Sequence, residues 1–506
     1  MKPLMASERP RAVRLTHLSL TEDQKKAAAS TAGRLFIEAS PGSGKTTVAA
    51  ERFGIARFDP RHASSGPVVA VSFTRSATSE LRRRVLRRWG PAATAWPHRI
   101  ETIDSFMRRV LEFLLRDGSL GWPGGHTELE ILDDWHGHAG FRPLDVNGWC
   151  RVMDVRDDGT IRTRAVRLGA PRWGFSNVGP IRDLLKSGLA TPREVRETLA
   201  EAFASPEIRD KTRSFLRGSA GHLIVDEVFD ANVLDLRLFH ACCQADVHVT
   251  FIGDPWQALY GWRGATPDQV EPFMDDKAFV RRELPHSFRF TTEQTQLLAH
   301  QLRTGEPAAL PGAVQVEVAL GRKWAALWAL DANVLPLSFG RPRNQTDAAM
   351  ALLLDVATRA LLRSPALFVR EAVLILGIGV DRFEQEGAAR LGPVLELLGA
   401  EGSAAALDAL RDAVVELGAA QRPPAVVANE AGHCANLDAL AMRLVQEATV
   451  PGLTVFQAKG LEWNSVGVHL TPQDGAHLAG GLDAEVDDHR VLYVALTRAR
   501  RNVGAL

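Results

Sequence analysis

Residues 35–47 constrain the fold and chemistry of this chain more than any other stretch. An apolar run ends at Ala39, a glycine-rich turn follows, and the residues after Gly44 can continue as a helix. Gly42 and Gly44 let the backbone turn its N–H groups toward an anion, and the start of the helix adds positive partial charge. Lys45 can reach the outer phosphates of a nucleotide, and Thr46 can bind Mg²⁺. The predicted loop, with Ala39 at the usual first glycine position, comprises Ser40, Pro41, Gly42, Ser43, Gly44, Lys45, Thr46 and Thr47.

The size and charge of the chain limit its class. A chain of 506 residues predicts about three or four domains or subdomains. Lys+Arg and Asp+Glu both number 60, so a nucleic acid would have to be held by a local patch, such as the arginines at 82–88. The four cysteines lack C-x-x-C spacing, which argues against a zinc or iron–sulfur site and suits a reducing cytoplasm. The chain has no long apolar run, so we expect neither a membrane span nor secretion.

Two later apolar runs end in carboxylates. Residues 222–227 read as a buried strand that ends in Asp226 and Glu227, and residues 247–254 read as a second strand that ends in Asp254. Ligands of open α/β sheets bind at the carboxyl ends of the strands. We therefore expect Asp226 to hold Mg²⁺ and Glu227 to orient or deprotonate the attacking water.

The remaining pattern divides the chain. Strands are expected at 67–73, 99–103, 313–319 and 335–339, and helices at 19–30, 76–89 and 105–115. Residues 116–221 lose the β-α alternation and read as an inserted subdomain, in which His136 and His138 have no matched further ligands for a metal. Residues 353–444 are rich in Ala and Leu at helical spacing, which predicts a helical insertion.

The string at 253–265, G-D-P-W-Q-A-L-Y-G-W-R-G-A, closely resembles motif III of the UvrD/Rep-like superfamily 1A DNA helicases. Further segments resemble the other motifs of that family, in the same order. Gln24 looks like the Q motif that reads adenine, His286-Ser287-Phe288-Arg289 looks like motif IV, and residues 454–463 are similar to motif V. Residues 488–499 resemble motif VI, in which Arg498 would act as an arginine finger.

The resemblance implies an α/β fold with two RecA-like parallel-sheet motor domains and smaller, mainly helical inserted subdomains. The implied divisions are 1–105 with 221–285 for the ATP-binding domain, 106–220 for a first insertion, 286–352 with 445–506 for the second motor domain, and 353–444 for a short second insertion.

The resemblance also implies an ATP-dependent, Mg²⁺-dependent helicase that moves 3′ to 5′ on single-stranded or tailed DNA in the cytoplasm. The implied catalytic residues are Lys45, Asp226, Glu227, Gln257, Arg289 and Arg498, with Thr46 and Asp226 at the metal and Gln24 and Glu462 at the nucleoside. The implied DNA contacts are Phe73, Thr74, Arg75, Thr102, Tyr260, Trp262, Arg263 and Thr454. Because the helix at 76–88 follows a DNA-facing motif, its arginines are also expected to meet phosphates.

Three positions differ from the family pattern. Phe229 stands where the family usually has Gln, Phe456 where it has His, and Asp104 where His is common. Phe229 removes a polar group that could link hydrolysis to the DNA side. Two alternatives therefore stay open: a DNA-stimulated ATPase that regulates a partner nuclease in a repair or phage-defence complex, and a P-loop enzyme without nucleic acid. The second does not explain Y-G-W-R-G at 260–264.

Overall fold

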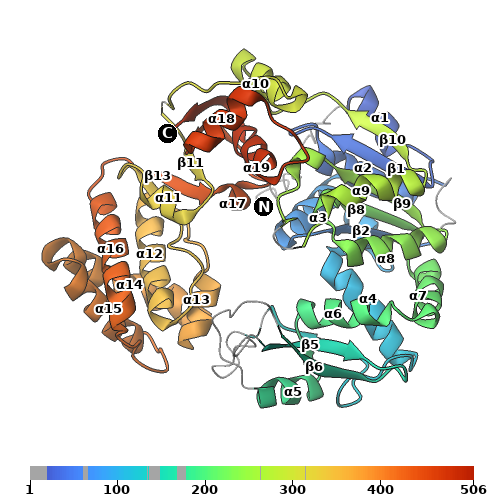
Figure 1. Cartoon of the computed structure of the whole chain (residues 1–506), viewed down its shortest axis with the longest axis horizontal. Coiled ribbons are helices and arrows are strands. Elements are labelled where there is room, and N and C mark those ends of the chain that lie inside the picture. Colours follow the sequence, from blue (N-terminus) through green and yellow to red (C-terminus); the bar gives the residue numbers. More distant parts are fainter. Residues whose placement is uncertain are drawn as a thin grey trace, which may run out of the picture.

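The computed structural model describes residues 20–60, 66–133, 135, 149–167, 178–261, 264–313 and 315–506. Two parallel β-sheets, with helices around each, lie side by side in the upper half of Figure 1. We call them, with their covering helices, the first lobe and the second lobe. The six-stranded sheet of the first lobe has the order β10-β1-β9-β8-β2-β3. Its strands are β1 (Arg34–Ala39), β2 (Val68–Ser72), β3 (Arg99–Thr102), β8 (His222–Asp226), β9 (His248–Gly253) and β10 (Val280–Leu284).

Alternating residues of β1 face opposite sides of this sheet. Leu35 and Ile37 pack in the hydrophobic cluster that contains Phe53, whereas Phe36 belongs to the cluster that contains Phe239 and Phe251. Both faces are thus buried, which explains why these strands read as continuous apolar runs. The covering helices are α1 (Glu22–Ala28), α2 (Lys45–Phe58), α3 (Arg75–Trp89), α8 (Val233–Gln244) and α9 (Pro267–Asp276).

The insertion between β3 and β8 continues the first lobe without a break. Helix α4 (Ile103–Arg116) starts directly after β3, and its residue Phe106 lies in the same hydrophobic cluster as Phe36. The insertion also contains an antiparallel hairpin, β5 (Trp149–Val155) with β6 (Ile161–Arg167), which the sequence reading did not predict. His136 and His138 lie outside the described residues. The other elements are β4 (Glu130–Ile131), α5 (Val178–Lys186), β7 (Leu189–Ala190), α6 (Pro192–Ala202) and α7 (Pro206–Ser219).

The second lobe is built on a five-stranded parallel sheet of order β12-β13-β11-β14-β15. The strand predicted at 313–319 is wrong in its bounds, because β11 covers Val318–Gly321. Gln315 has a φ of 49°, in the left-handed region, which interrupts an extended strand there. The other strands are β12 (Val334–Pro336), β13 (Val450–Thr454), β14 (Trp463–Val468) and β15 (Ala499–Ala505), and the helices are α10 (Glu293–Thr304), α11 (Trp324–Trp328), α17 (Val455–Ala458), α18 (Pro472–Gly480) and α19 (Asp487–Leu496).

Five helices form a separate group at the left of Figure 1. Their hydrophobic cluster contains Leu353, Leu391, Leu410 and Leu437, and it meets the second sheet at Leu335 of β12. The first helix begins at Gln345, before the predicted 353, because the Asn344 side chain caps it by accepting from the Asp347 backbone N–H at 2.8 Å. The helices are α12 (Gln345–Leu362), α13 (Val369–Leu376), α14 (Val380–Glu401), α15 (Ser403–Glu416) and α16 (Val427–Leu444). In the ranges described, no helix has the length and apolarity needed to cross a bilayer.

Candidate nucleotide site between the two lobes

The glycine-rich loop joins β1 to α2 as the sequence predicts. Gly42 and Gly44 have φ values of +76° and +86°, which favour glycine over any residue with a Cβ. A Cβ at Gly42 would lie 2.4 Å from the Arg289 Cβ, so this residue also allows a close approach of two chain segments. Ser43 Oγ and Lys45 Nζ are buried and have no hydrogen-bond partner in the described part of the chain. These buried donors fit an anionic group of the size of a triphosphate.

The Gln24 side chain hydrogen-bonds to the glycine-rich loop. Its Nε2 donates to the Ser43 carbonyl at 2.8 Å, and its Oε1 accepts from the Thr21 backbone N–H at 3.0 Å. A Cβ at Gly44 would lie 2.7 Å from the Gln24 Nε2. The structure therefore places Gln24 at the loop, and its predicted contact with adenine stays a prediction.

Asp226 and Glu227 lie at the carboxyl end of β8, facing the loop. Lys45 Nζ is 3.6 Å from the Glu227 Oε1. Burial raises the pKa of Asp226, and the adjacent Glu227 charge raises it further, because two carboxylates share a dry site. Burial alone would raise the pKa of Glu227, but Lys45 and Lys459 lower it below its ordinary value. Asp226 is buried, and a carboxylate and a hydroxyl are oxygen ligands of the kind that Mg²⁺ prefers. The predicted binding of Mg²⁺ by Thr46 and Asp226 stays a prediction.

A second-lobe lysine completes this cluster. Lys459, which follows α17, donates from Nζ to the Asp230 Oδ2 at 2.6 Å across the boundary between the lobes. The same ammonium lies 4.9 Å from the centre of the Tyr260 ring. Burial raises the pKa of Asp230 to about 6 although Lys459 opposes this shift. The sequence contains both residues within motif-like strings, but nothing in it indicates that they meet.

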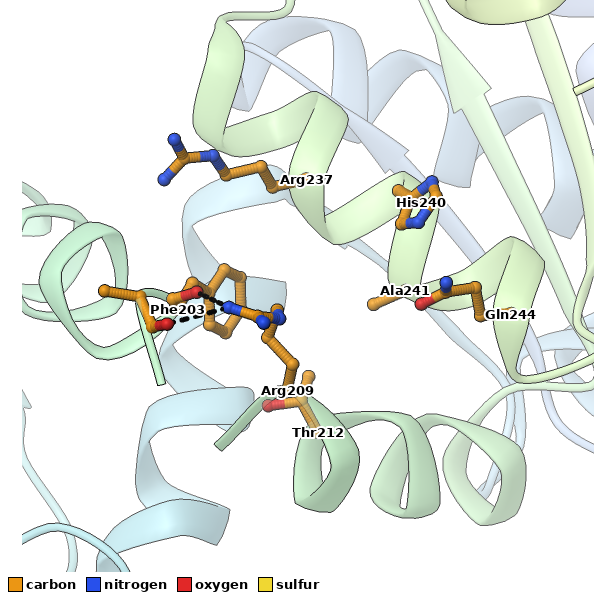
Figure 2. A pocket seen from close by; sticks show the side chains of 8 residues that line it. Phe203, Arg209, Thr212, Arg237, His240, Ala241 and Gln244 are labelled. Carbon is orange, nitrogen blue, oxygen red and sulfur yellow. Dashed lines mark hydrogen bonds between the residues drawn. The ribbon is translucent and has the colours of Figure 1, made fainter. Parts of the chain in front are cut away.

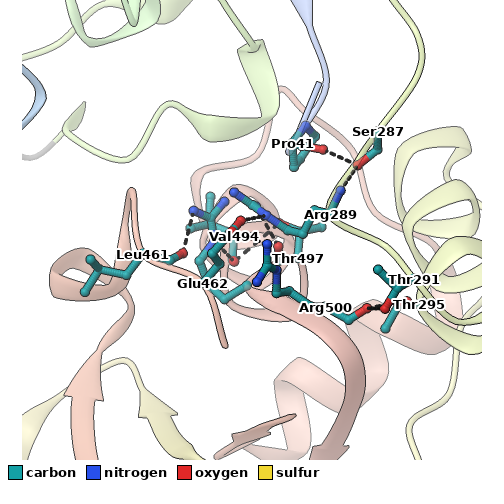
Figure 3. A network of polar contacts seen from close by, with 11 residues as sticks. Pro41, Ser287, Arg289, Thr291, Thr295, Leu461, Glu462, Val494, Thr497 and Arg500 are labelled. Carbon is teal, nitrogen blue, oxygen red and sulfur yellow. Dashed lines mark hydrogen bonds and ion pairs between the residues drawn. The ribbon is translucent and has the colours of Figure 1, made fainter. Parts of the chain in front are cut away.

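Arg289 lies in the connection between the two sheets, rather than within the second lobe. The backbone around it is held by the loop, since the Ser287 Oγ donates to the Pro41 carbonyl at 2.6 Å and the Phe288 N–H donates to the Gly42 carbonyl at 3.0 Å. Its side chain reaches the second lobe (Figure 3), where Nε donates to the Glu462 Oε2 at 2.9 Å and Nη1 to the Thr497 carbonyl at 2.8 Å. Arg289 therefore contacts both lobes at the phosphate loop.

Arg498 is fully buried just before β15. Its Nε donates to the Val494 carbonyl at 3.0 Å, whereas its Nη2 has no hydrogen-bond partner among the described residues. Burial lowers the pKa of Arg498 to about 9, the charge of Arg289 lowers it as well, and Glu227 opposes the shift. Arg498 thus faces Glu227 of the first lobe, and an anion between the lobes would relieve its repulsion with Arg289.

Glu462 and Gln257 have partners within the protein. Glu462 bridges Arg289 and the Arg500 Nη2, which lies 3.2 Å from its Oε1. The Gln257 Nε2 donates to the Asp254 Oδ2 at 2.8 Å. Their predicted contacts with ribose and γ-phosphate stay predictions.

Several residues predicted at DNA have structural roles in their own lobe. Thr74 and Thr102 cap α3 and α4 through their hydroxyls, and Thr454 is buried at the start of α17. Phe73 packs partly against the core of the first lobe, and Arg75 forms an exposed ion pair with Asp133. Trp262 and Arg263 lie outside the described residues. The predicted contacts of these residues with DNA stay predictions.

The expectation that the arginines of α3 face phosphates fits only part of that helix. Arg83 and Arg84 both pair with Glu80, and Arg88 pairs with Glu51 at 2.7 Å. Arg82 donates to the Ile100 carbonyl. These two carboxylates offset only part of the positive charge of the five arginines in this run, and the predicted contact of the helix with phosphates stays a prediction.

The three residues that differ from the family pattern each contact other residues of their own lobe. Phe229 is buried and meets the Phe36 ring edge-on at 5.9 Å. Asp104 accepts from the Arg196 Nε at 2.6 Å, which ties α4 to α6. Phe456 packs partly against the core of the second lobe.

Phe288 is a candidate that the sequence reading missed. Its ring is 50% exposed, whereas its backbone N–H is bonded to the phosphate loop. An exposed ring held at this place can stack on the base of a bound nucleotide. The string H-S-F-R at 286–289 contained this signal, because it sets an aromatic residue next to the arginine that is predicted at the γ-phosphate.

A separate cavity of about 370 Å³ opens between α7, α8 and the turn after α6 (Figure 2). The Arg209 Nη1 donates there to the carbonyls of Phe203 and Ala204, at 2.7 and 2.9 Å. None of the residues that line this cavity belongs to the nucleotide site.

The fold and the site define a two-lobed P-loop nucleotide-binding protein with acids on the first lobe and cations reaching in from the second. A comparison with known protein families agrees with this class and narrows it to one family of helicase domains. Residues 20–134 and 193–278 match the UvrD/REP helicase N-terminal domain, and the chain is UvrD/Rep-like.

Curated relatives have names of the same kind. A probable DNA helicase of Mycoplasma pneumoniae is 24% identical over 52% of this chain and 51% of that protein, and DNA helicase II of Escherichia coli is 23% identical over 67% and 46%. The ATP-dependent DNA helicase PcrA of Bacillus subtilis is 26% identical over 50% and 35%. The chain spans about half the length, or less, of the curated relatives that it matches.

Proposed function

We propose that this chain is an ATP-dependent DNA helicase that moves along single-stranded DNA and couples ATP hydrolysis to strand separation. One observation carries the proposal: Arg289, Lys459 and Arg498 bring three cations to the loop and acids of the first lobe. A site assembled from two lobes can hydrolyse ATP only when the lobes are together, so turnover can drive their opening and closing. The two lobes would correspond to the two predicted motor domains.

The residues of the site divide the work of phosphoryl transfer. Lys45 and the loop N–H groups bind the outer phosphates, and Glu227 orients the attacking water. A magnesium ion bound by Thr46 and Asp226 would supply charge neutralisation on the phosphates. Arg289 and Arg498 stabilise the charge that develops in the transition state. Lys45 would exchange its contact with Glu227 for the phosphates, which would leave that carboxylate free to act as a base.

DNA is the proposed substrate because the relatives are named DNA helicases and because Tyr260 lies at the lobe boundary, over Lys459. An aromatic ring in such a position can stack on a base without reading its sequence. The 3′ to 5′ direction follows only from similarity to the UvrD/Rep-like family.

The test is ATP hydrolysis by the full chain with no DNA, with single-stranded DNA and with duplex DNA, followed by displacement of a strand from a 3′-tailed duplex. We expect hydrolysis to rise on single-stranded DNA and the tailed duplex to be unwound. An ATPase rate that is the same with and without DNA would contradict the proposal and favour an enzyme with no nucleic-acid substrate. A 5′-tailed duplex is the matched control for direction.

A second candidate is a DNA-stimulated ATPase that regulates a partner such as a nuclease. The buried Phe229 favours it, because this ring packs in the core where a polar side chain could have linked the acids to the DNA side. Stimulation of hydrolysis by DNA without strand displacement would support this candidate over the helicase.

A further inference from the structure

Arg303 connects the second lobe to two carboxylates of the first lobe. It lies in the last turn of α10, and that helix is anchored to β15 through bonds such as the one from the Thr295 Oγ1 to the Arg500 carbonyl at 3.2 Å. The Arg303 Nη1 donates to the Asp254 Oδ1 at 3.0 Å, and its Nη2 donates to the Glu38 Oε1 at 2.7 Å. The guanidinium thus joins the ends of β1 and β9 to a helix of the other lobe.

Asp254 binds Gln257 as well as Arg303. The Asp254 side chain is fully buried, and its Oδ1 also accepts from the Trp256 backbone N–H at 3.3 Å. Its other oxygen, Oδ2, accepts from the Gln257 Nε2 at 2.8 Å. A single carboxylate therefore receives Arg303 on one side and fixes the Gln257 amide on the other.

The contact makes the position of Gln257 depend on the docking of the lobes. If the second lobe moved away, Asp254 would lose its guanidinium and remain as a buried charge with one amide donor and one backbone donor. Such a charge is strongly unfavourable, so η3 (Pro255–Gln257) would rearrange.

We propose that Arg303 is a positioning residue, which through Asp254 holds the Gln257 amide in place for its predicted contact with the γ-phosphate only while the lobes are docked. The assignment rests on the proposed ATPase function. It adds a route by which lobe closure would act on Gln257, and this route starts at Arg303, outside the motif-like strings. Arg303 does not touch the nucleotide itself and acts through Asp254.

The kinetic test uses Arg303→Met with Arg281→Met as the matched control. Arg281 also bridges two carboxylates, Glu271 and Asp275, but all three lie within the first lobe. We expect Arg303→Met to lower kcat about tenfold or more with a less than about twofold change in the KM for ATP, because the loop that binds ATP is intact. Arg281→Met should match the wild type.

A double variant shows whether Arg303 acts through Gln257. If it does, Arg303→Met combined with Gln257→Ala should be no slower than Gln257→Ala alone, because coupled residues are not additive. Fully multiplicative losses would overturn the assignment, as would wild-type kinetics of Arg303→Met. Arg303→Lys should recover part of the lost kcat, because an ammonium can reach Asp254 but cannot bridge both carboxylates in the same way.

A readout without turnover separates this assignment from the proposed function. Hydrogen exchange in the nucleotide-free protein should be faster at the amides of η3 in Arg303→Met than in the wild type, and unchanged there in Arg281→Met. If the wild type hydrolyses no ATP, the proposed function fails, and exchange at η3 decides the placement of Gln257 by Arg303. Equal exchange at η3 in the wild type, Arg303→Met and Arg281→Met would overturn the assignment of Arg303 as a positioning residue.

Discussion

Lys459 of the second lobe and Asp230 of the first lobe form a buried ion pair at 2.6 Å, 229 positions apart in the sequence. The Asp230 Oδ1 has no partner in the described structure, so Lys459 is its carboxylate's main source of stabilisation. The pair joins the lobes beside the acids of the nucleotide site. Its titration should therefore be visible both in stability and in lobe docking.

We expect Asp230 to make the protein less stable as the pH rises from about 4 to about 6. Burial raises the pKa of this carboxyl from 3.8 to about 6, so the folded state binds more protons than the unfolded state in this range. The stability that protonation provides is present below 3.8 and lost as the pH rises through about 6. The loss amounts to about 3 kcal/mol at most. Urea unfolding of the wild type and Asp230→Asn at several pH values would measure it, and parallel pH profiles of the two proteins would contradict the prediction.

Arg498→Ala should retain ATP binding and lose turnover. The loop and Lys45 stay intact, but the buried cation that faces the acids is removed. An arginine finger typically contributes on the order of 10³–10⁵ in rate. Binding of a fluorescent ATP analogue and steady-state hydrolysis would test this, with Arg501→Ala, an exposed neighbour on β15, as the control. An unchanged rate for Arg498→Ala would remove this residue from the mechanism.

Gly42→Ala should abolish nucleotide binding while leaving most of the fold intact. The new methyl group would lie 2.4 Å from the Arg289 Cβ, and the φ of +76° disfavours any side chain. We expect the substitution to destabilise the loop conformation by about 1–3 kcal/mol. Gly118→Ala, at a φ of +75° with open space around it, controls for the backbone alone. Equal affinity for ATP in Gly42→Ala and the wild type would show that the loop tolerates the methyl group.

Phe288→Ala should raise the KM for ATP without lowering the unfolding temperature. The ring is half exposed, so its removal costs little packing, whereas loss of base stacking should cost about 0.5–1.5 kcal/mol of binding. The KM for inorganic triphosphate, which has no base, is the matched comparison. If both KM values rise alike, the ring acts on the loop and not on the base.

Much of the first lobe could be predicted from the sequence because its signals are local. The phosphate loop, the strand that ends in Asp226 and the helix that starts near Ser76 all depend on residues next to one another. The family resemblance added the order of the motifs. The strand predicted at 313–319 failed because alternation alone does not show that Gln315 has a left-handed backbone.

The contacts between the lobes could not be predicted in this way. Arg303 meets Glu38 and Asp254, and Lys459 meets Asp230, across separations that no periodic pattern connects. The same holds for the arginines at 82–88, because nothing in the basic run itself indicates that Arg83 and Arg84 pair with Glu80 and that Arg88 pairs with Glu51. A linear reading gives the charges of a segment but not the partners that it finds.

The insertion and the five-helix group are joined to the lobes in different ways. Phe106 of α4 shares one apolar interior with Phe36 and Phe251 of the first sheet, whereas the interior of α12–α16 comes mainly from these helices and includes Leu335 of β12. Tilting the insertion against the first lobe would tear open that common interior. The five-helix group is fastened to the second lobe by polar bonds, because the buried Arg443 of α16 donates to the carbonyls of Val334, Trp328 and Leu330 at 2.6, 3.0 and 3.0 Å. A rotation of that group against the second sheet would have to break these bonds and strand a buried guanidinium.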